Sequence, residues 1–339
     1  MALDRQQSLE HLVDILKSVA EPTRLRILAL LRQGDLTVSD LTDILGQSQP
    51  RVSRHLKLLL ESGAIERYQE GAWAYFRLCD NESRRSFLAE IVERLSPRDP
   101  QVERDNERLT TVKTRRRQKA SDYFRANAAG WDELRTLHVS DEAVEQALRD
   151  VVGTRSFQAM LDLGTGTGRL LELFAPLYRR GVGIDQSREM LAIARANLEA
   201  AGIAHAQVRQ GDVLAPPVER DAFDLVTLHQ VLHYLDDPET AVREAARHLR
   251  PGGKLVIVDF ASHDLEFLRE EHAHLRLGFS DKQIMEWLEA AGLEIGEIRN
   301  FQPQNADGRL TVKFWVGLDQ RMLIADTEAA LASGLRETV

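Results

Sequence analysis

The sequence contains a single cysteine, Cys79, among its 339 residues. One thiol cannot form a disulfide within the chain or build a metal site of several cysteines, so both are excluded. The sequence also lacks any apolar run of 18 or more residues, and acidic residues interrupt the amphipathic stretch 1–22. We therefore predict neither a membrane-spanning helix nor a signal peptide, and we expect a cytoplasmic protein with no membrane partner.

Charge is distributed unevenly along the chain. Residues 1–120 contain 21 Lys and Arg against 18 Asp and Glu, a net charge of +3, whereas residues 121–339 contain 23 against 35, a net charge of −12. The length and the hydrophobic content of 43% allow two globular domains. The asymmetry favours a polyanionic partner for the first part only.

Helical spacing of apolar residues predicts short helices in the first 62 residues: Leu9–Lys17, Arg24–Arg32, Thr37–Leu45 and Arg51–Ser62. The last two flank a turn that contains Gly46, which is typical of a helix-turn-helix. Apolar residues of the last helix form one stripe. Polar side chains lie on the other faces of this helix or just before its start. They are Gln49, Arg51, Ser53, Arg54 and Lys57.

These residue types suit a DNA major groove. Arginine can donate two hydrogen bonds to guanine, glutamine can pair with adenine, and serine or lysine can contact phosphate. A polar helix face can also simply be solvated. The segments Ala64–Tyr68 and Trp73–Leu78 then alternate like the two strands of a β-hairpin, and Arg67 and Arg77 in it are placed to contact phosphates.

Residues 8–95 resemble the ArsR-type winged-helix repressors through AEPTRLRILALL, DLTDILGQSQPRVSRHLKLLLESGAI and EGAWAYFRL. The resemblance implies operator DNA as a partner and a homodimer whose outer helices, Leu9–Lys17 and Ser83–Leu95, pack together. Metal sensing is not implied. Thr37-Val38-Ser39 stands where metal-responsive members have a pair of cysteines, and Ser83–Leu95 contains no histidine.

Residues 96–120 are rich in charge and are predicted to be a linker that runs into a solvated helix. A new domain is expected to begin at Ser121, where the aromatic residues Tyr123, Phe124 and Trp131 interrupt the polar pattern. Their helix either covers a ligand pocket or packs beneath the domain.

The stretch Met160–Leu170, MLDLGTGTGRL, reads as a buried strand, a glycine-rich turn and the start of a helix. Such a turn lets a ligand approach the backbone beside the free N–H groups of a helix N-terminus, as in nucleotide sites. A dinucleotide fingerprint requires a third glycine where this chain has Arg169, and no Gly-Lys-Ser/Thr follows. Both a dinucleotide motif and a P-loop are therefore excluded.

The order Asp162-x-Gly164-x-Gly166-x-Gly168 instead resembles the class I S-adenosylmethionine-dependent methyltransferases of the UbiE type. Further matches follow at Val182–Asp185, Gln210–Val213 and Phe223–Leu228, and at Leu249–Lys254 ahead of a strand at Leu255–Asp259. The resemblance implies a Rossmann-like α/β domain over residues 121–318 with a seven-stranded, mostly parallel sheet. The expected fold is thus an α+β winged helix-turn-helix over residues 1–95, followed by this domain and a tail, 319–339.

By the same resemblance, Asp185 would accept hydrogen bonds from the ribose hydroxyls, Met190 would pack against adenine, and Asp212 would accept from the adenine amino group. The implied cofactor is S-adenosylmethionine or its product S-adenosylhomocysteine. The full set of expected cofactor contacts is Asp162, Gly164, Thr165, Gly166, Gly168, Asp185, Gln186, Met190, Gly211, Asp212, Val213 and His229.

Methyl transfer requires alignment of the acceptor, and it requires a base only if the acceptor must lose a proton. His229 and His233 follow the predicted strand Phe223–Leu228 and are the candidates for that base. The alternative for each is a histidine that only lines the pocket or packs under it. No metal site is predicted, because His272 and His274 are two residues apart and do not share a helix face.

Two functions remain open from the sequence. One is a DNA-binding regulator that responds to an S-adenosyl ligand, with feedback on methionine or one-carbon metabolism as a hypothesis drawn from the cofactor's identity. The other is a small-molecule methyltransferase in which the winged helix serves dimerisation. The polar residues on the predicted recognition helix favour the regulator, and the lack of further cysteines argues against arsenic methylation.

Overall fold

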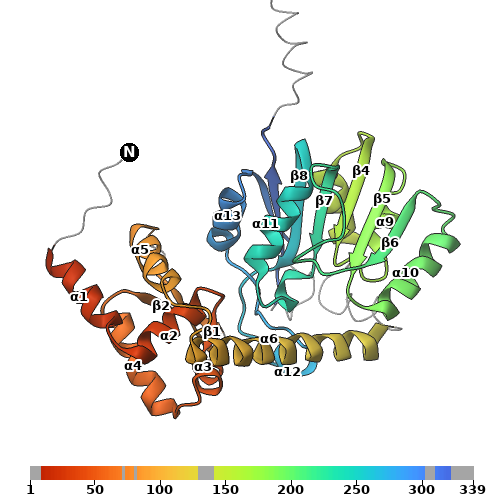
Figure 1. Cartoon of the computed structure of the whole chain (residues 1–339). Helices are drawn as coiled ribbons and strands as arrows, with labels where there is room; N and C mark the ends of the chain where they lie inside the picture. Colours follow the sequence, from red (N-terminus) through yellow and green to blue (C-terminus); the bar gives the residue numbers. More distant parts are fainter. Residues whose placement is uncertain (1–8, 71–72, 80–81, 129–140, 302–309, 322–339) are drawn as a thin grey trace, which may run out of the picture. The chain divides into compact units, whose positions relative to one another are not determined.

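The computed structural model describes residues 9–70, 73–79, 82–128, 141–301 and 310–321. The chain divides into two compact units between Gln118 and Lys119 (Figure 1). Several sequence predictions lie outside the described residues: the tip of the hairpin at 71–72, Trp131, the loop at 302–308 and most of the tail.

The first unit is a winged helix-turn-helix, as predicted. From α1 to α5, its elements in chain order are α1 (Leu9–Val19), α2 (Pro22–Leu31), β1 (Leu36–Thr37), α3 (Val38–Leu45), α4 (Gln49–Glu61), β2 (Ile65–Glu70), β3 (Trp73–Leu78) and α5 (Glu82–Glu93).

Local sequence explains the boundaries of the helix-turn-helix. Thr37 and Asp40 form a capping box at the start of α3, in which Thr37 Oγ1 accepts from the Asp40 N–H and Asp40 accepts from the Thr37 N–H. Gly46 ends α3 in the left-handed conformation, with φ of 63°. The strand β1 was not predicted, because two residues show no periodicity. It joins the sheet by pairing Leu36 with Phe76 and Thr37 with Tyr75 of β3.

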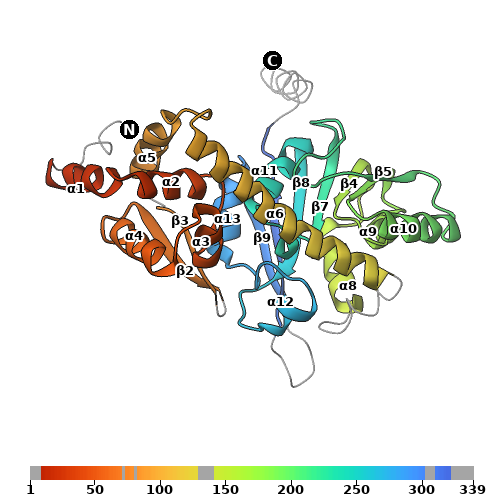
Figure 2. The same ribbon diagram turned by 60° about the horizontal axis from the view of Figure 1, so that its bottom comes forward.

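Residues 96–120 were predicted to be a linker that runs into a solvated helix, and in the structure the helix begins at Pro100 and takes up nearly all of this segment. A single helix, α6 (Pro100–Asn127), runs from the first unit into the second (Figure 2). The Asp99 carboxylate accepts hydrogen bonds from the N–H groups of Gln101 and Val102, and proline occupies the first helical position, where its missing N–H costs nothing. The charged residues that suggested a linker are good helix formers, so they extend this helix.

The second unit has the predicted α/β fold. Its helices are α8 (Asp141–Val152), α9 (Arg169–Phe174), α10 (Arg188–Ala200), α11 (Pro238–His248), α12 (Phe267–Glu271) and α13 (Asp281–Ala290), with the short 3-10 helix η2 (Leu232–Tyr234). Its strands are β4 (Phe157–Leu163), β5 (Tyr178–Asp185), β6 (Ala206–Gln210), β7 (Phe223–His229), β8 (Leu249–Phe260), β9 (Glu294–Phe301) and β10 (Val312–Leu318).

These strands form one sheet in the order β6-β5-β4-β7-β8-β10-β9. Strand β10 is antiparallel to both of its neighbours, and β4 to β8 run parallel. Alternate residues of a strand face opposite sides, so Met160 packs with α8, α9 and α10, whereas Leu161 packs with α11 and α13. Helices therefore cover both faces, and the carboxyl ends of the parallel strands share one edge.

Strand β8 begins earlier than the sequence indicated. Leu249–Gly253 was expected to be a break before a strand at Leu255, but Leu249 already pairs with Phe223 of β7. The register then shifts before Leu225 pairs with Lys254, so an irregular pairing absorbs the Pro-Gly-Gly segment within the strand. None of the helices in the described ranges is both long and apolar enough to cross a membrane.

Candidate functional site

The glycine-rich turn after β4 adopts a conformation that suits glycine. Gly164, Gly166 and Gly168 all have positive φ, at 74°, 52° and 83°. A Cβ on Gly164 would lie 2.5 Å from Val231 Cγ2, so the position lacks room for a side chain as well. The N–H groups of Gly164 and Thr165 donate to the Ile184 carbonyl, which fixes the turn to the end of β5.

Asp162 supports this turn from beneath. Its carboxylate is buried and accepts hydrogen bonds from Thr165 Oγ1 at 2.7 Å and from Thr227 Oγ1 at 2.6 Å. Asp162 therefore links the turn to β7, and we interpret its role in a cofactor site as shaping the turn.

Asp185 lies at the end of β5 and faces the turn. Its Oδ2 accepts from the Gly166 N–H at 2.9 Å, and its Oδ1 accepts from the Ser187 N–H at 2.8 Å. Burial raises the pKa of Asp185, and backbone N–H groups, including these two, oppose the rise by stabilising the carboxylate. A carboxylate has about four acceptor positions, so Asp185 retains capacity for a pair of neighbouring hydroxyls. It fits the predicted ribose contact.

The remaining predicted cofactor contacts follow the ends of β5 and β6. The Gly211 N–H donates to the Asp185 carbonyl at 3.0 Å, which joins the end of β6 to the end of β5. Asp212 is half-buried and accepts from the Leu214 N–H, while Met190 and Val213 are buried and Gln186 is exposed. Carboxylates beside apolar side chains suit a nucleoside, whose sugar is polar and whose base is flat and apolar.

Arg169 occupies the position of the missing third glycine and binds protein. Its guanidinium donates to both carboxylate oxygens of Glu145 in α8, at 2.6 and 2.8 Å, and to Glu172 at 3.0 Å. These hydrogen bonds raise the pKa of Arg169 further above its usual range. Arg169 thus fastens α9 to α8.

On the far side of the glycine turn, the structure distinguishes the two candidate histidines. His229 is half-buried at the end of β7. His233 is buried, and its Nδ1 lies 2.7 Å from Asp259 Oδ1. Asp259 is itself fully buried and also accepts from the N–H groups of Leu232 and Phe260. Asp259 is thereby held in place by two backbone N–H groups, in a position to orient the imidazole of His233.

Sequence reasoning missed Asp259 as a site residue. The only signal was an acidic residue inside the apolar run of β8, VIVDF. A buried acid needs a partner, but the partner comes from a different segment, which the sequence does not identify.

Aromatic rings surround His233. The rings of Tyr234, His274 and Phe260 have centroids 4.1, 4.2 and 5.1 Å from that of His233. The end of α6 joins this cluster, because Tyr123 hydrogen-bonds to His272 Nδ1 at 2.7 Å and Phe124 packs edge-on against Tyr234. These contacts attach the end of α6 to the aromatic cluster around His233 and are compatible with both interpretations of the aromatic helix.

In the first unit, the predicted DNA-contacting residues of the recognition helix lie on exposed surface. Val52, Leu56 and Leu59 are buried in the core. The polar residues around this stripe are all exposed, namely Gln49, Arg51, Ser53, Arg54 and Lys57. The exposed face of α4 therefore carries hydrogen-bond donors suited to base edges and phosphates.

The two arginines of the wing differ. Arg67 is exposed and donates to Gln69. Arg77 is half-buried, pairs with Glu66 at 3.3 Å and lies over the Tyr68 ring. Arg67 is thus the better placed of the two for a phosphate. Within the described ranges, no cluster of three or more His, Cys, Asp or Glu side chains could hold a metal ion.

Comparison with known proteins identifies both units. Residues 21–67 match the family model described as bacterial regulatory protein, arsR family, and residues 161–257 match the one described as methyltransferase domain. The chain joins an ArsR-type winged helix to a methyltransferase domain. The match confirms the cofactor class predicted from the sequence, S-adenosylmethionine.

Individual relatives resemble one unit each. The Arsenical resistance operon repressor of Escherichia coli is 46% identical over 67 residues, which are 20% of this chain and 57% of the repressor. The Ubiquinone/menaquinone biosynthesis C-methyltransferase UbiE of Roseobacter denitrificans is 34% identical over 122 residues, 34% of this chain and 48% of that enzyme. The chain spans about half the length of these curated relatives.

A solved structure supports the fold of the second unit. A Haloferax volcanii protein in complex with the Trm112 methyltransferase activator aligns with a TM-score of 0.50 and 23% identity, covering 60% of this chain and 99% of that one. At this identity the similarity concerns the fold alone.

The glycine turn of the methyltransferase domain yields a test with a matched control. Gly164→Ala should weaken S-adenosylhomocysteine binding at least about tenfold, because 1.4 kcal/mol of strain in the turn suffices and the new Cβ would displace Val231. Gly153 also has positive φ, 84°, but a Cβ there meets nothing within 4 Å. Both variants should lose about 1–2 kcal/mol of stability through the left-handed backbone, and Gly153→Ala should bind normally. Calorimetry and thermal unfolding measure both effects, and equal ligand affinity would contradict the assignment.

Proposed function

We propose that this protein is a DNA-binding transcription regulator whose affinity for its operator depends on an S-adenosyl ligand in its methyltransferase domain. The observation that carries the proposal is the exposed donor-rich face of α4, in a chain that also has a methyltransferase domain. A winged helix used only for dimerisation does not need Gln49, Arg51 and Arg54 on an exposed face.

On the DNA side, α4 would enter the major groove. Arg51 and Arg54 would donate to guanine or phosphate, Gln49 would pair with adenine, and Arg67 of the wing would contact the backbone. By analogy with ArsR-type repressors, we propose a homodimer that binds double-stranded operator DNA with two recognition helices about one turn apart.

On the ligand side, Asp185 would accept from the ribose hydroxyls and Asp212 from the adenine amino group. Met190 and Val213 would provide apolar contacts to the base. The backbone of Gly164–Gly168 would approach the remainder of the ligand without a Cβ in the way. S-adenosylmethionine and S-adenosylhomocysteine share these parts, so both are candidates.

The two sites would be linked thermodynamically. A ligand changes DNA binding only by the difference between its affinities for the DNA-competent and the incompetent protein. Because S-adenosyl compounds report on methyl-group supply, feedback on methionine or one-carbon metabolism is the regulatory role we propose.

A second function, methyl transfer to a small molecule, is favoured by the buried His233–Asp259 pair. Bound S-adenosylmethionine supplies an electrophilic methyl group with a good leaving group. Asp259 would hold the Nδ1–H of His233, so that Nε2 can take the proton released as the acceptor forms its bond to the methyl carbon. In this function the winged helix would serve dimerisation.

The DNA interface is tested by removing two arginines. Arg51→Ala with Arg54→Ala should weaken binding to duplex DNA from the protein's own upstream region about 100-fold, because each specific contact is worth about 1–3 kcal/mol. Fluorescence anisotropy measures the affinity. The exposed pair Arg94→Ala with Arg98→Ala removes the same charge from the same unit and should have a small effect. If both double variants lost DNA affinity equally, α4 would contribute only general electrostatic attraction to DNA.

The ligand site is tested with Asp185→Ala. This variant should lose S-adenosylhomocysteine binding and the response of DNA affinity to both S-adenosyl compounds, yet bind DNA normally without ligand. Asp150→Ala, which removes an exposed acid of α8, should behave like the wild type. Regulation is refuted if neither compound changes the wild-type affinity for DNA. Loss of ligand-free DNA binding in Asp185→Ala would mean that the domain is merely structural.

Turnover is tested through Asp259→Asn. With a small-molecule extract as the source of acceptors, the wild type should convert S-adenosylmethionine to S-adenosylhomocysteine, and the variant should be slower by about 10²-fold, the lower range for general-base catalysis. Nitrogen NMR should show His233 protonated on Nδ1 in the wild type and not in the variant. Asp264→Asn changes a nearby exposed acid and is the control. Turnover that is absent from the wild type, or equal in all three proteins, would contradict this role.

A further inference from the structure

We infer that α6 transmits the state of the methyltransferase site to the helix-turn-helix. This inference rests on the proposed regulatory function and names the element that carries the regulation.

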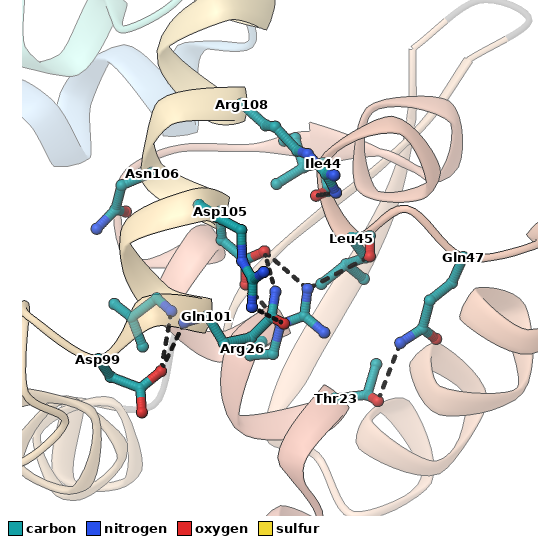
Figure 3. Close-up of polar contacts among 12 residues, drawn as sticks. Thr23, Arg26, Ile44, Leu45, Gln47, Asp99, Gln101, Asp105, Asn106 and Arg108 are labelled. Atoms are coloured by element: carbon teal, nitrogen blue, oxygen red, sulfur yellow. Dashed lines mark hydrogen bonds and ion pairs between the residues drawn. The ribbon is translucent and has the colours of Figure 1, made fainter.

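The first half of α6 is fastened to the winged helix by a buried ion pair. Asp105 is 3% exposed, and Arg26 of α2 donates to both of its carboxylate oxygens, at 2.5 and 2.7 Å (Figure 3). Gln101 adds a third hydrogen bond to the same carboxylate. Leu109 is buried in the core of this unit. Such a buried, bidentate pair resists displacement far more than a surface ion pair does.

The same contacts reach the turn of the helix-turn-helix. Arg26 also donates to the Leu45 carbonyl, and Arg108 of α6 donates to the Ile44 carbonyl at 3.0 Å (Figure 3). Ile44 and Leu45 are the last residues of α3, immediately before the turn that leads to the recognition helix α4. A shift of α6 would therefore act on the carbonyls that end α3 and set the direction of α4.

The last turns of α6 contact both sides of the methyltransferase site. Tyr123 hydrogen-bonds to His272, and Phe124 packs on Tyr234, the residue after His233. Arg125 lies 3.6 Å from Glu189, in the first turn of the helix that follows Asp185. Both side chains of this last pair are about half exposed, so we assign most of the coupling to Tyr123 and Phe124.

The helix between these two sets of contacts is continuous. Roughly five helical turns separate Asp105 from Tyr123, and each turn is hydrogen-bonded to the next. By this inference, a rotation or shift at Tyr123 and Phe124 would be passed along the backbone to Asp105 and Arg108. By linkage, DNA binding must change ligand affinity by the same factor as ligand binding changes DNA affinity.

The test interrupts the helix between its two sets of contacts. Thr114 and Arg115 are exposed, and the pair Thr114→Gly with Arg115→Gly weakens the helix because glycine is a poor helix former. The matched pair Thr114→Ala with Arg115→Ala removes the same side chains but favours the helix. The full-length proteins are compared by calorimetry with S-adenosylhomocysteine and by anisotropy with the upstream duplex, each with and without the other ligand.

The glycine pair should bind S-adenosylhomocysteine alone and DNA alone within about twofold of the wild-type affinities. The factor by which either one changes the affinity for the other should fall to about one. The alanine pair should keep the wild-type effect, which for typical couplings is about 5- to 150-fold. An undiminished effect in the glycine pair would overturn the role of α6 and leave the proposed function standing. No effect in the wild type would instead refute the proposed function, and this inference with it.

If the glycine pair no longer binds DNA, a second variant tests whether α6 couples the two sites. Tyr123→Phe removes only the hydroxyl that bonds to His272 and leaves α6 intact. It should retain ligand-free DNA affinity and show a reduced mutual effect of the two ligands. A full wild-type effect in Tyr123→Phe would then overturn the inference.

Discussion

The hydrogen bond from the Gly166 N–H to the Asp185 carboxylate joins the ends of two parallel strands, and the geometry of the ligand site depends on it. The turn after β4 that presents this N–H contains three glycines with positive φ. Asp162 fixes that turn from below through two hydroxyls, and Gly211 extends the connection to β6. One carboxylate is thereby held rigidly where a ribose would lie, which is how preorganised sites gain affinity.

The opposite side of the site is built differently. Here a second buried carboxylate, Asp259, orients His233 inside a shell of aromatic rings. The proposed nucleoside contacts and an oriented imidazole thus follow strands of the same sheet, an arrangement that would suit an enzyme or a sensor of small molecules. The exposed polar face of α4 is the feature on which we base the proposal of regulation.

The helix α6 gives the two units their connection. A flexible linker would let them act independently, since it transmits neither rotation nor shift. In α6, Asp105 is held by contacts within the first unit, and Tyr123 and Phe124 are held by contacts within the second. The charge-rich composition that makes this segment look like a linker is also what keeps an exposed helix stable in water.

Sequence by itself determined the elements whose pattern is local. The capping residues of α3, the apolar stripe of α4, the alternation in the wing and the glycine turn with its following acids are each written in a few adjacent residues, so both domains and the cofactor class were predictable from them. Tertiary structure decided the features that depend on distant partners. Among strands, these are the pairing of the two-residue β1 and the early start of β8. Among side chains, they are the ion pair of Arg77 with Glu66 and the contact of Asp259 with His233, and the extent of α6 is a further case. In each case the energy comes from contacts between segments far apart in the chain, which local patterns do not encode.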